Sequence, residues 1–232
     1  MPDLRPLVIF GASRGVGLEL ARLECAAGRR AVAPVRAQSD TTALGGTGAE
    51  RARADALSPR EVAGVLAAID GDFDIVSTLG GRAENGRRAD DTGNINVIDA
   101  AVATGRARRF VLVTSIGCGE MAPFRSARAI AAFGAAVDAK TLAEDRLRSS
   151  GLTWTILRPG GLVSEPATGR GLLSGDPEMH GFIHRADVAQ LAFRVLRDPA
   201  TAGHAFAAVD AQRMSSVNAI HPFPLAGQDF RT

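Results

Sequence analysis

The sequence predicts an α/β fold built on a doubly wound parallel sheet, and two features of its 232 residues support that prediction. Short apolar runs of strand length alternate with longer segments in which apolar residues recur every three or four positions. Parallel neighbours need crossover connections, and the helical segments between the runs supply them. The chain fits one domain, residues 1–232, with a small C-terminal cap at about 160–184.

The first strand and helix set the pattern for the rest of the chain. PLVIF (6–10) is typical of a strand buried on both faces, and a helix over 15–28 follows it, with Gly28 as its C-cap. Further strands are expected at 31–35, 50–54, 74–79, 109–115, 153–157 and 204–209. Further helices are expected at 58–69, 93–104, 126–149 and 185–197. Loop or irregular structure is expected at 36–49, in the cap at 160–181 and in the tail after 210.

Composition narrows the class of protein. Apolar residues make up 46% and charged residues 22% of the chain, and no apolar run approaches the ~20 residues that span a bilayer. Arginines are interleaved with acids, so we expect neither a nucleic-acid partner nor a membrane partner. The N-terminus leads into a strand without a signal segment, and the two cysteines lack metal-ligand spacing. We therefore expect a cytoplasmic protein without a metal site.

The stretch GASRGVG (11–17) lies between the first strand and the first helix. Glycines at 11, 15 and 17 allow a tight turn and the close approach of a pyrophosphate, whose charge sits at the positive N-terminus of the helix. With a strand before it and a helix after it, the stretch indicates a dinucleotide-binding (Rossmann) fold. Gly11, Ser13, Gly15, Val16 and Gly17 are the expected cofactor contacts in this turn.

Arginine occupies the position that distinguishes NAD from NADP. An acid at the end of the second strand binds the ribose 2′-hydroxyl, whereas an arginine accommodates a 2′-phosphate. Arg36 stands there, and Arg14 in the glycine turn offers a second guanidinium, so the sequence favours NADP(H). Asp55, after the third strand, either holds the adenine amino group or caps the turn before the next helix.

The remaining cofactor contacts are expected in other loops. In this architecture ligands bind beyond the carboxyl ends of the strands, so the loops after residues 10, 35, 79, 115 and 157 should surround one site. These loops place Leu79, Gly80, Thr114 and Pro159 beside the cofactor.

Three longer stretches resemble one family of proteins. They are GNINVIDAAVATGRARRFVLVTSIG (93–117), AKTLAEDRLRSSGLTWTILRPGGL (139–162) and IHRADVAQL (183–191). Together with the glycine turn they resemble the short-chain dehydrogenase/reductase superfamily, in particular its atypical NAD(P)H-binding subgroup of NmrA-like regulators and biliverdin/flavin reductases. The resemblance extends to about residue 209 and leaves the substrate open.

The resemblance implies a catalytic serine at the end of the fifth strand and a Tyr-x-x-x-Lys pair on the next helix. The matching positions hold Ser115, Ala136 and Lys140, and the chain has no tyrosine at all. Lys140 is also the only lysine among 27 basic residues. By resemblance its ammonium is expected to hold the nicotinamide ribose, a task separate from proton donation, and Ser115 is expected to face the substrate.

The absence of tyrosine affects which substrates the protein can reduce. Reduction of an ordinary ketone needs a proton donor, and a positioned acid typically contributes 10²- to 10⁴-fold. A quinone, a flavin or a polycyclic aromatic acceptor spreads the incoming charge and can take its proton from solvent. We therefore expect an NADPH-dependent reductase of a conjugated small molecule, with His184 as the alternative proton donor.

Two other functions remain open at this point. One is a regulator that senses NAD(P) without turning it over, as among the NmrA-like relatives. The other is an epimerase or dehydratase, which is less favoured because no tyrosine base is present. The alanine-rich helix at 126–149 also permits a homo-oligomer.

Overall fold

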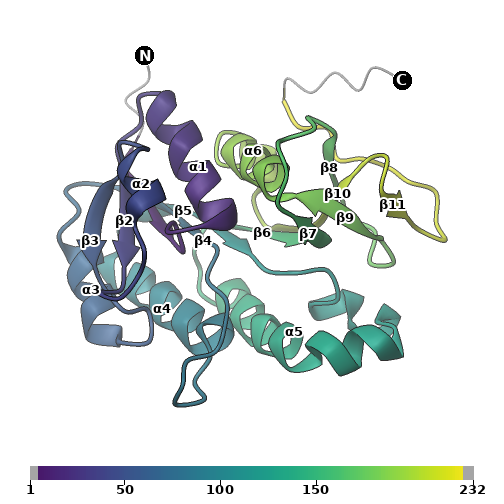
Figure 1. Cartoon of the computed structure of the whole chain (residues 1–232), viewed down its shortest axis with the longest axis horizontal. Helices are drawn as coiled ribbons and strands as arrows, with labels where there is room; N and C mark the ends of the chain where they lie inside the picture. Colours follow the sequence, from purple (N-terminus) through teal and green to yellow (C-terminus); the bar gives the residue numbers. More distant parts are fainter. Residues whose placement is uncertain (1–4, 227–232) are drawn as a thin grey trace.

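The computed structural model describes residues 5–226, and its main sheet has eight strands in the order β3-β2-β1-β4-β5-β6-β10-β8 (Figure 1). Seven of them run parallel, and β8 pairs antiparallel with β10 at one edge. The predicted doubly wound α/β fold is confirmed. The strands are β1 (Leu7–Phe10), β2 (Ala31–Val35), β3 (Glu50–Arg53), β4 (Phe73–Ser77), β5 (Ala107–Val113), β6 (Trp154–Pro159), β8 (Gly171–Ser174) and β10 (His204–Asp210).

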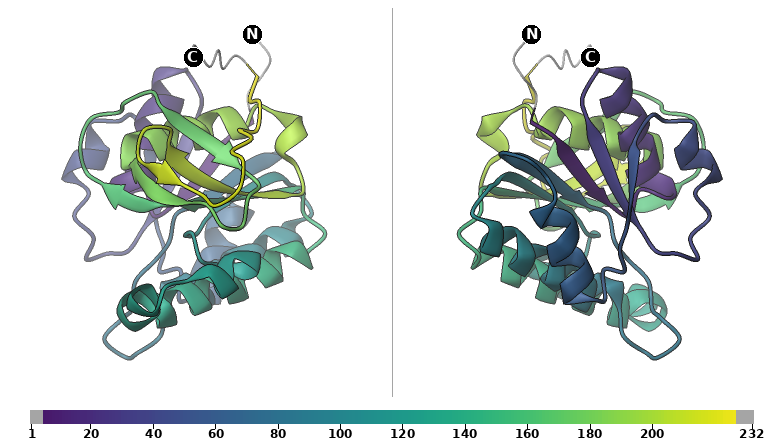
Figure 2. Two further views of the ribbon diagram at one scale, coloured as in Figure 1. Left: turned by 90° about the vertical axis from the view of Figure 1, so that its right-hand side faces the viewer. Right: turned by 90° about the vertical axis from the view of Figure 1, so that its left-hand side faces the viewer.

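Helices cover both faces of this sheet, as the two side views of Figure 2 show. One face carries α1 (Gly15–Ala26) and α6 (Arg185–Val195), which pack against each other, and the short α2 (Thr42–Gly45). The other face carries α3 (Pro59–Ala67), α4 (Asn94–Thr104) and α5 (Ala127–Arg148). None of the helices in residues 5–226 is both long enough and apolar enough to cross a membrane.

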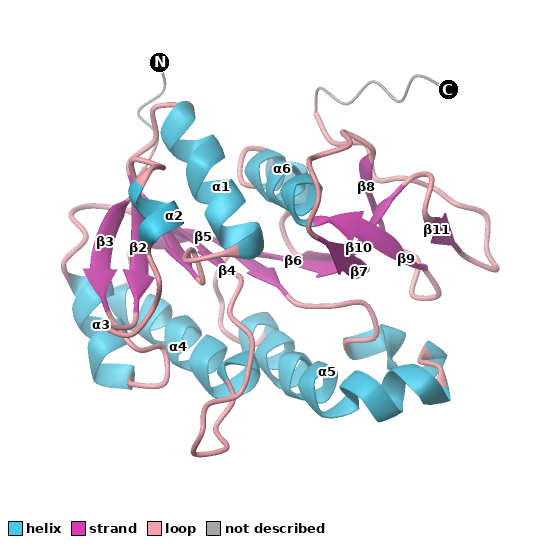
Figure 3. Ribbon diagram, viewed as in Figure 1, coloured by secondary structure: helices cyan, strands magenta, loops and turns pink. Residues whose placement is uncertain are grey.

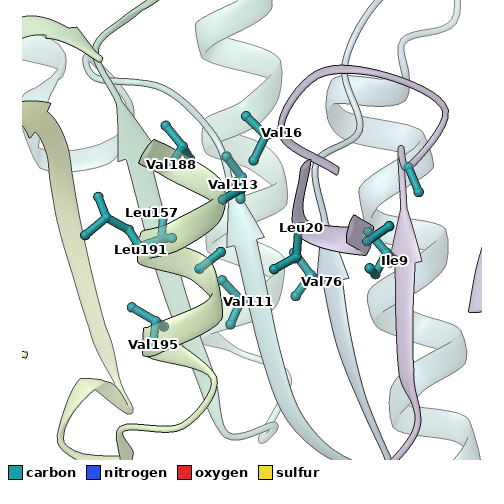
Figure 4. Close-up of a cluster of buried hydrophobic side chains, with 14 of the residues drawn as sticks. Ile9, Val16, Leu20, Val76, Val111, Val113, Leu157, Val188, Leu191 and Val195 are labelled. Atoms are coloured by element: carbon teal, nitrogen blue, oxygen red, sulfur yellow. The ribbon is translucent and has the colours of Figure 1, made fainter. Parts of the chain in front are cut away.

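Each face of the sheet has its own apolar core, because successive side chains of a strand point to opposite faces. Val111 and Val113 of β5 pack with α1 and α6, where Leu20 and Leu191 lie (Figure 4). Phe110 and its neighbours pack on the α3, α4 and α5 side. Continuous apolar runs such as LVIF are therefore buried on both sides, as the sequence indicates.

The prediction of an irregular cap at 160–181 is wrong. The segment contains β7 (Gly161–Val163), β8 and the start of β9 (His180–His184), and β11 (Met214–Ser215) of the tail joins β9 and β7 in a second sheet (Figure 3). These strands have two to five residues, too few to show a period, and they form because partners far along the chain lie beside them. Gly171, for example, pairs with Asp210 of β10.

Small shifts of element ends also matter for the site. Strand β5 ends at Val113 and β4 ends at Ser77, so the residues that follow them belong to loops rather than strands. A π-helical turn, Ala89–Gly93, precedes α4 in what was expected to be loop, and α2 interrupts the expected loop at 36–49. The loops that follow β1, β4, β5 and β6 all leave the same edge of the sheet, where a ligand site is expected.

Candidate functional site

The glycine turn packs directly against the loop after β4. Gly11 has φ +88°, and a Cβ there would lie 2.5 Å from the Thr78 Oγ1. A Cβ on Gly17 would lie 2.5 Å from the Gly11 carbonyl oxygen. The Thr78 hydroxyl donates to the carbonyls of Phe10 and Gly11 at 3.2 and 3.3 Å. Only glycine fits at 11 and 17, and the close packing brings the N-terminus of α1 to the crevice between β1 and β4.

This crevice is the point at which the strand order reverses, because β1 lies between β2 and β4 in the sheet. The residue before α1, Arg14, is extended and its side chain makes no cap bond, so the first N–H groups of α1 are left for a ligand. The turn therefore fits the pyrophosphate of a dinucleotide, whose negative charge the helix N-terminus favours.

Lys140 reaches the loop after β4 from the opposite helix layer. Its Nζ lies 2.9 Å from the Asp90 Oδ1 and donates to the Leu79 carbonyl at 3.4 Å. A Cβ on Gly80 would lie 3.1 Å from both of these charged atoms. The structure thus brings together the predicted residues Lys140, Leu79 and Gly80 and adds Asp90, whose side chain is 3% exposed.

Asp90 is a site residue that the sequence analysis missed. Its Oδ2 also accepts from the Gly81 N–H at 3.0 Å, and the Arg88 Nη1 lies 3.5 Å away. Asn94 holds the same loop: its side-chain oxygen accepts from Ser77 at 2.6 Å, and its amide donates to the Asp90 carbonyl at 2.9 Å. The only sequence signal for Asp90 is its place just before a helix at a strand's carboxyl end.

The two hydroxyls after β5 have different surroundings. The Thr114 hydroxyl donates to the buried Glu144 Oε1 at 2.7 Å. The buried Arg158 bonds Glu144 at 2.5 Å and the more exposed Glu120 at 2.8 Å. The Ser115 side chain is partly exposed and makes no hydrogen bond within residues 5–226. The Thr114 side chain is therefore engaged within the fold, whereas the Ser115 hydroxyl has no partner in residues 5–226.

Pro159 lies beside these hydroxyls. The Ile116 N–H donates to the Pro159 carbonyl at 2.9 Å, so the loops after β5 and β6 run together past the end of the sheet. Burial lowers the pKa of Arg158, but its hydrogen bonds to Glu144 and Glu120 outweigh this effect and raise the pKa above the usual value. Arg158 therefore stays charged, and its bonds to Glu144 and Glu120 hold the base of both loops.

His184, the predicted alternative proton donor, and Cys118, a thiol in the loop after β5, are both held within the fold. His184 ends β9, and its Nδ1 lies 2.7 Å from the Pro166 carbonyl, which requires that nitrogen to donate. Its Nε2 faces Glu165 at 3.8 Å, and no contact in residues 5–226 joins it to Ser115 or Lys140. Cys118 is fully buried, and burial raises the pKa of its thiol to about 12, so it stays protonated.

The expected adenosine contacts lie at the ends of β2 and β3. Arg14 and Arg36 are both exposed, and neither forms an ion pair within the described chain. The Asp55 Oδ1 accepts from the Leu57 N–H at 2.9 Å, and the Asp55 N–H donates to Glu61. This geometry matches the alternative in which Asp55 caps the turn, while its second oxygen keeps no partner in residues 5–226.

Arg185 of α6 is a further residue that the sequence analysis assigned only to a helix start. A Cβ on Gly15 would lie 3.5 Å from its Cδ, and its guanidinium bonds Ser164 at 2.5 Å. A cleft of about 570 Å³ lies here, lined in part by Gly15, Glu165 and Gln190. Arg185, which is distant in the sequence, thus places a positive charge beside the glycine turn.

Known proteins resemble this chain over most of its length. A family model described as NAD(P)H-binding matches residues 11–199. The structure of ChuY, an anaerobilin reductase from Escherichia coli O157:H7, is 39% identical with a TM-score of 0.80 and covers 89% of this chain and 97% of its own. ChuY of E. coli strain CFT073 is 38% identical with a TM-score of 0.78, covering 90% and 98%. The uncharacterized sugar epimerase YhfK of Bacillus subtilis is 33% identical over 179 residues, 75% of this chain and 79% of that protein.

The chain therefore belongs to the NAD(P)H-binding family of Rossmann-fold proteins. Its recognition as an atypical member of the short-chain dehydrogenase/reductase superfamily is confirmed. A nicotinamide cofactor fits the glycine turn and the Lys140 position described above.

Proposed function

We propose that this protein is an NADPH-dependent reductase of a conjugated small molecule. Its class as an oxidoreductase that uses a nicotinamide cofactor follows from the family and from the anaerobilin reductase that it resembles. The observation on which the proposal depends is Lys140 at the loop after β4, one helical turn from Ala136, in a chain without tyrosine.

In the proposed mechanism, different residues bind the pyrophosphate and the ribose of the cofactor. Gly11, Gly15 and Gly17 admit the pyrophosphate, and Lys140 holds a ribose hydroxyl with the donor hydrogen that Asp90 and Leu79 leave free. Bound NADPH would supply a hydride and leave as NADP⁺. The acceptor takes that hydride with its electron pair, delocalises the charge and gains a proton from solvent, because no tyrosine supplies one.

An uncovered apolar face on α5 supports a flat, conjugated substrate. The face that buries Val137 and Leu147 against the sheet continues towards the helix N-terminus through Phe133 and Ile130, which are 65% and 50% exposed. Figure 1 shows this half of α5 beyond α4, on the cap side of the molecule. Phe133 and Lys140 are seven residues apart, or about two turns, so both belong to this face.

The neighbour described as an anaerobilin reductase narrows the substrate class. A bilin has an extended conjugated system that tolerates added negative charge, which matches the lack of a phenolic donor. A bilin-like chromophore is therefore the first acceptor to test, ahead of flavins and quinones.

The test is NADPH oxidation by the purified protein against bilins, flavins, quinones and saturated ketones, followed by the loss of NADPH absorbance. We expect turnover with conjugated acceptors and little with saturated ketones. We also expect Lys140→Ala to lower kcat/KM by at least tenfold, about 1.4 kcal/mol. Tight NADPH binding without turnover of any acceptor would instead support the sensing regulator.

The epimerase alternative also belongs in the assay, because one relative is named as a sugar epimerase. An epimerase oxidises and re-reduces the same sugar, so it converts a nucleotide sugar without net loss of NADPH. Conversion of UDP-sugars without such loss would contradict the reductase proposal. The absence of a tyrosine base makes this outcome the less expected one.

A further inference from the structure

The arginines of this chain are mostly engaged, and the exceptions are not spread evenly. Within residues 5–226 the arginines without a hydrogen bond, ion pair or ring contact of the side chain are Arg14, Arg36, Arg53, Arg60, Arg87 and Arg128. The first three follow or end β1, β2 and β3, which are neighbours in the sheet. Three exposed and unpaired guanidinium groups therefore gather at the carboxyl edge of three adjacent parallel strands.

The register of β3 directs Arg53 to the same side as the glycine turn. Arg53 pairs with Val35 across β2 and β3, and residues paired in this way point to the same face of a sheet. Val35 packs against the core under α1, so Arg53 also points to the α1 face. Neighbouring strands lie about 4.8 Å apart, which is well within the reach of an arginine side chain.

Arg51 shows how far side chains on this face extend. It lies two residues before Arg53, on the same face, and its Nη1 donates to the Thr41 Oγ1 at 3.2 Å. Thr41 belongs to the loop that begins with Arg36. Arg53 lies one pleat nearer the carboxyl edge, so its guanidinium has access to the start of that loop.

The nearby carboxylates have other partners. The Asp40 Oδ1 accepts from the Thr42 N–H at 2.9 Å, and this bond lowers the pKa of that carboxyl. Glu50 pairs with Arg30 at 2.8 Å. None of the acids in residues 5–226 pairs with Arg14, Arg36 or Arg53, which leaves three positive charges for an anion.

We infer that Arg53 is a third guanidinium for the 2′-phosphate of NADPH, beside Arg36 and Arg14, and that it helps to set the preference for NADPH over NADH. This inference rests on the proposed function for its ligand. The residue at the end of β2 usually distinguishes NADP from NAD, and the inference adds a residue from β3 to it. Each guanidinium offers charge-assisted hydrogen bonds to phosphate oxygens.

The test is a titration of the purified protein with NADPH, NADH and 2′,5′-ADP in the absence of any acceptor. Arg53→Ala should raise the Kd for NADPH and for 2′,5′-ADP by about tenfold and leave the Kd for NADH within about twofold. Arg53→Lys should keep part of the affinity, because the charge remains. Arg128→Ala, an equally exposed and unpaired arginine on α5, is the matched control and should change neither Kd.

The outcomes separate this inference from the proposed function. If Arg36→Ala weakens NADPH binding and Arg53→Ala does not, Arg53 is no phosphate ligand and the NADPH proposal stands. Loss of NADPH and NADH binding together in a folded Arg53→Ala variant would also overturn the inference. If neither variant changes the NADPH preference, the 2′-phosphate site itself is wrong.

Discussion

The contact between Lys140 and Asp90 holds the lysine in place although no tyrosine lies one turn before it on α5. The Asp90 carboxylate is almost buried and receives bonds from both Lys140 and the Gly81 N–H. An ammonium has three donor hydrogens, and two of them face Asp90 and the Leu79 carbonyl. The direction of the third hydrogen is set by the other two, so we expect Asp90 to be a positioning residue for Lys140.

Asp90→Asn is expected to loosen this arrangement while keeping the size of the side chain. The amide cannot balance the ammonium, and leaving a buried charge partner unmatched typically costs about 1–3 kcal/mol. We expect kcat to fall by about tenfold and the Kd for NADPH to rise by less, because the ribose is held but misplaced. Stopped-flow hydride transfer and cofactor titration measure the two effects separately.

The adjacent aspartate provides the control for that experiment. Asp91 is the next residue of the π-helical turn. Its carboxylate accepts from the Thr92 N–H and makes no contact with Lys140 within the described chain. Asp91→Asn should therefore leave both quantities within about twofold. Equal effects of the two variants would mean that the turn as a whole, and not the Asp90 charge, matters for Lys140.

At the scale of elements, α5 has a face whose surroundings change along its length. Glu144 and Leu147 on this face are buried, and Phe133 is exposed. Since Ile130 and Phe133 are at least half exposed, the apolar side chains of the N-terminal half are little used for packing within the described chain. We therefore propose that this half of α5 contacts an apolar acceptor.

Phe133→Ala tests that assignment. We expect KM for a conjugated acceptor to rise about two- to tenfold, because an aromatic contact contributes about 0.5–1.5 kcal/mol, and the Kd for NADPH to stay unchanged. Leu142→Ala is the control, since Leu142 is 56% exposed and nine residues from Phe133, on the opposite face of α5. Steady-state kinetics measure KM for both variants. Equal changes in KM in Phe133→Ala and Leu142→Ala would contradict the assignment.

The elements also show how far the sequence could be interpreted. The glycine turn was predictable because its spacing occurs between a strand and a helix, and Lys140 because of its uniqueness and its spacing. The cap strands were not predictable, since β7 has only three residues and pairs with a segment about 20 residues later. Asp90, Arg53 and Arg185 have no local pattern, and only the register of strands and loops brings them to the site.

For the molecule as a whole, carboxylates attach the cap loop to the rest of the fold. Asp187 of α6 accepts from the N–H groups of Thr168 and Gly169 at 3.0 and 2.8 Å. Asp210, at the end of β10, bonds Arg170 with both oxygens at 3.0 and 2.9 Å. The loop between β7 and β8 is thus connected to both a helix and the main sheet, next to the cleft that contains Arg185.

The Asp210 contact predicts a dependence of stability on pH. Burial raises the pKa of this carboxyl, but its bonds to Arg170 and to the Gln212 N–H outweigh burial and hold the pKa below the usual 3.8. A carboxyl whose pKa is lower in the folded state stabilises the fold above the unfolded pKa, and the stabilisation is lost as pH falls through the folded pKa. Asp210 should therefore contribute fully at neutral pH and lose its contribution below about pH 4.

Asp210→Asn should lower the free energy of unfolding by about 1–2 kcal/mol at pH 7, a modest value because Arg170 is 39% exposed and solvent screens the pair. The difference between wild type and variant should be constant from about pH 7 to pH 5 and shrink below about pH 4, as wild-type Asp210 becomes protonated. Urea unfolding at a series of pH values measures it. Asp138→Asn, which removes an exposed partner of Arg125, should cost less than about 0.5 kcal/mol. A difference that grows as the solution becomes more acidic would show that Asp210 is not stabilised as a carboxylate.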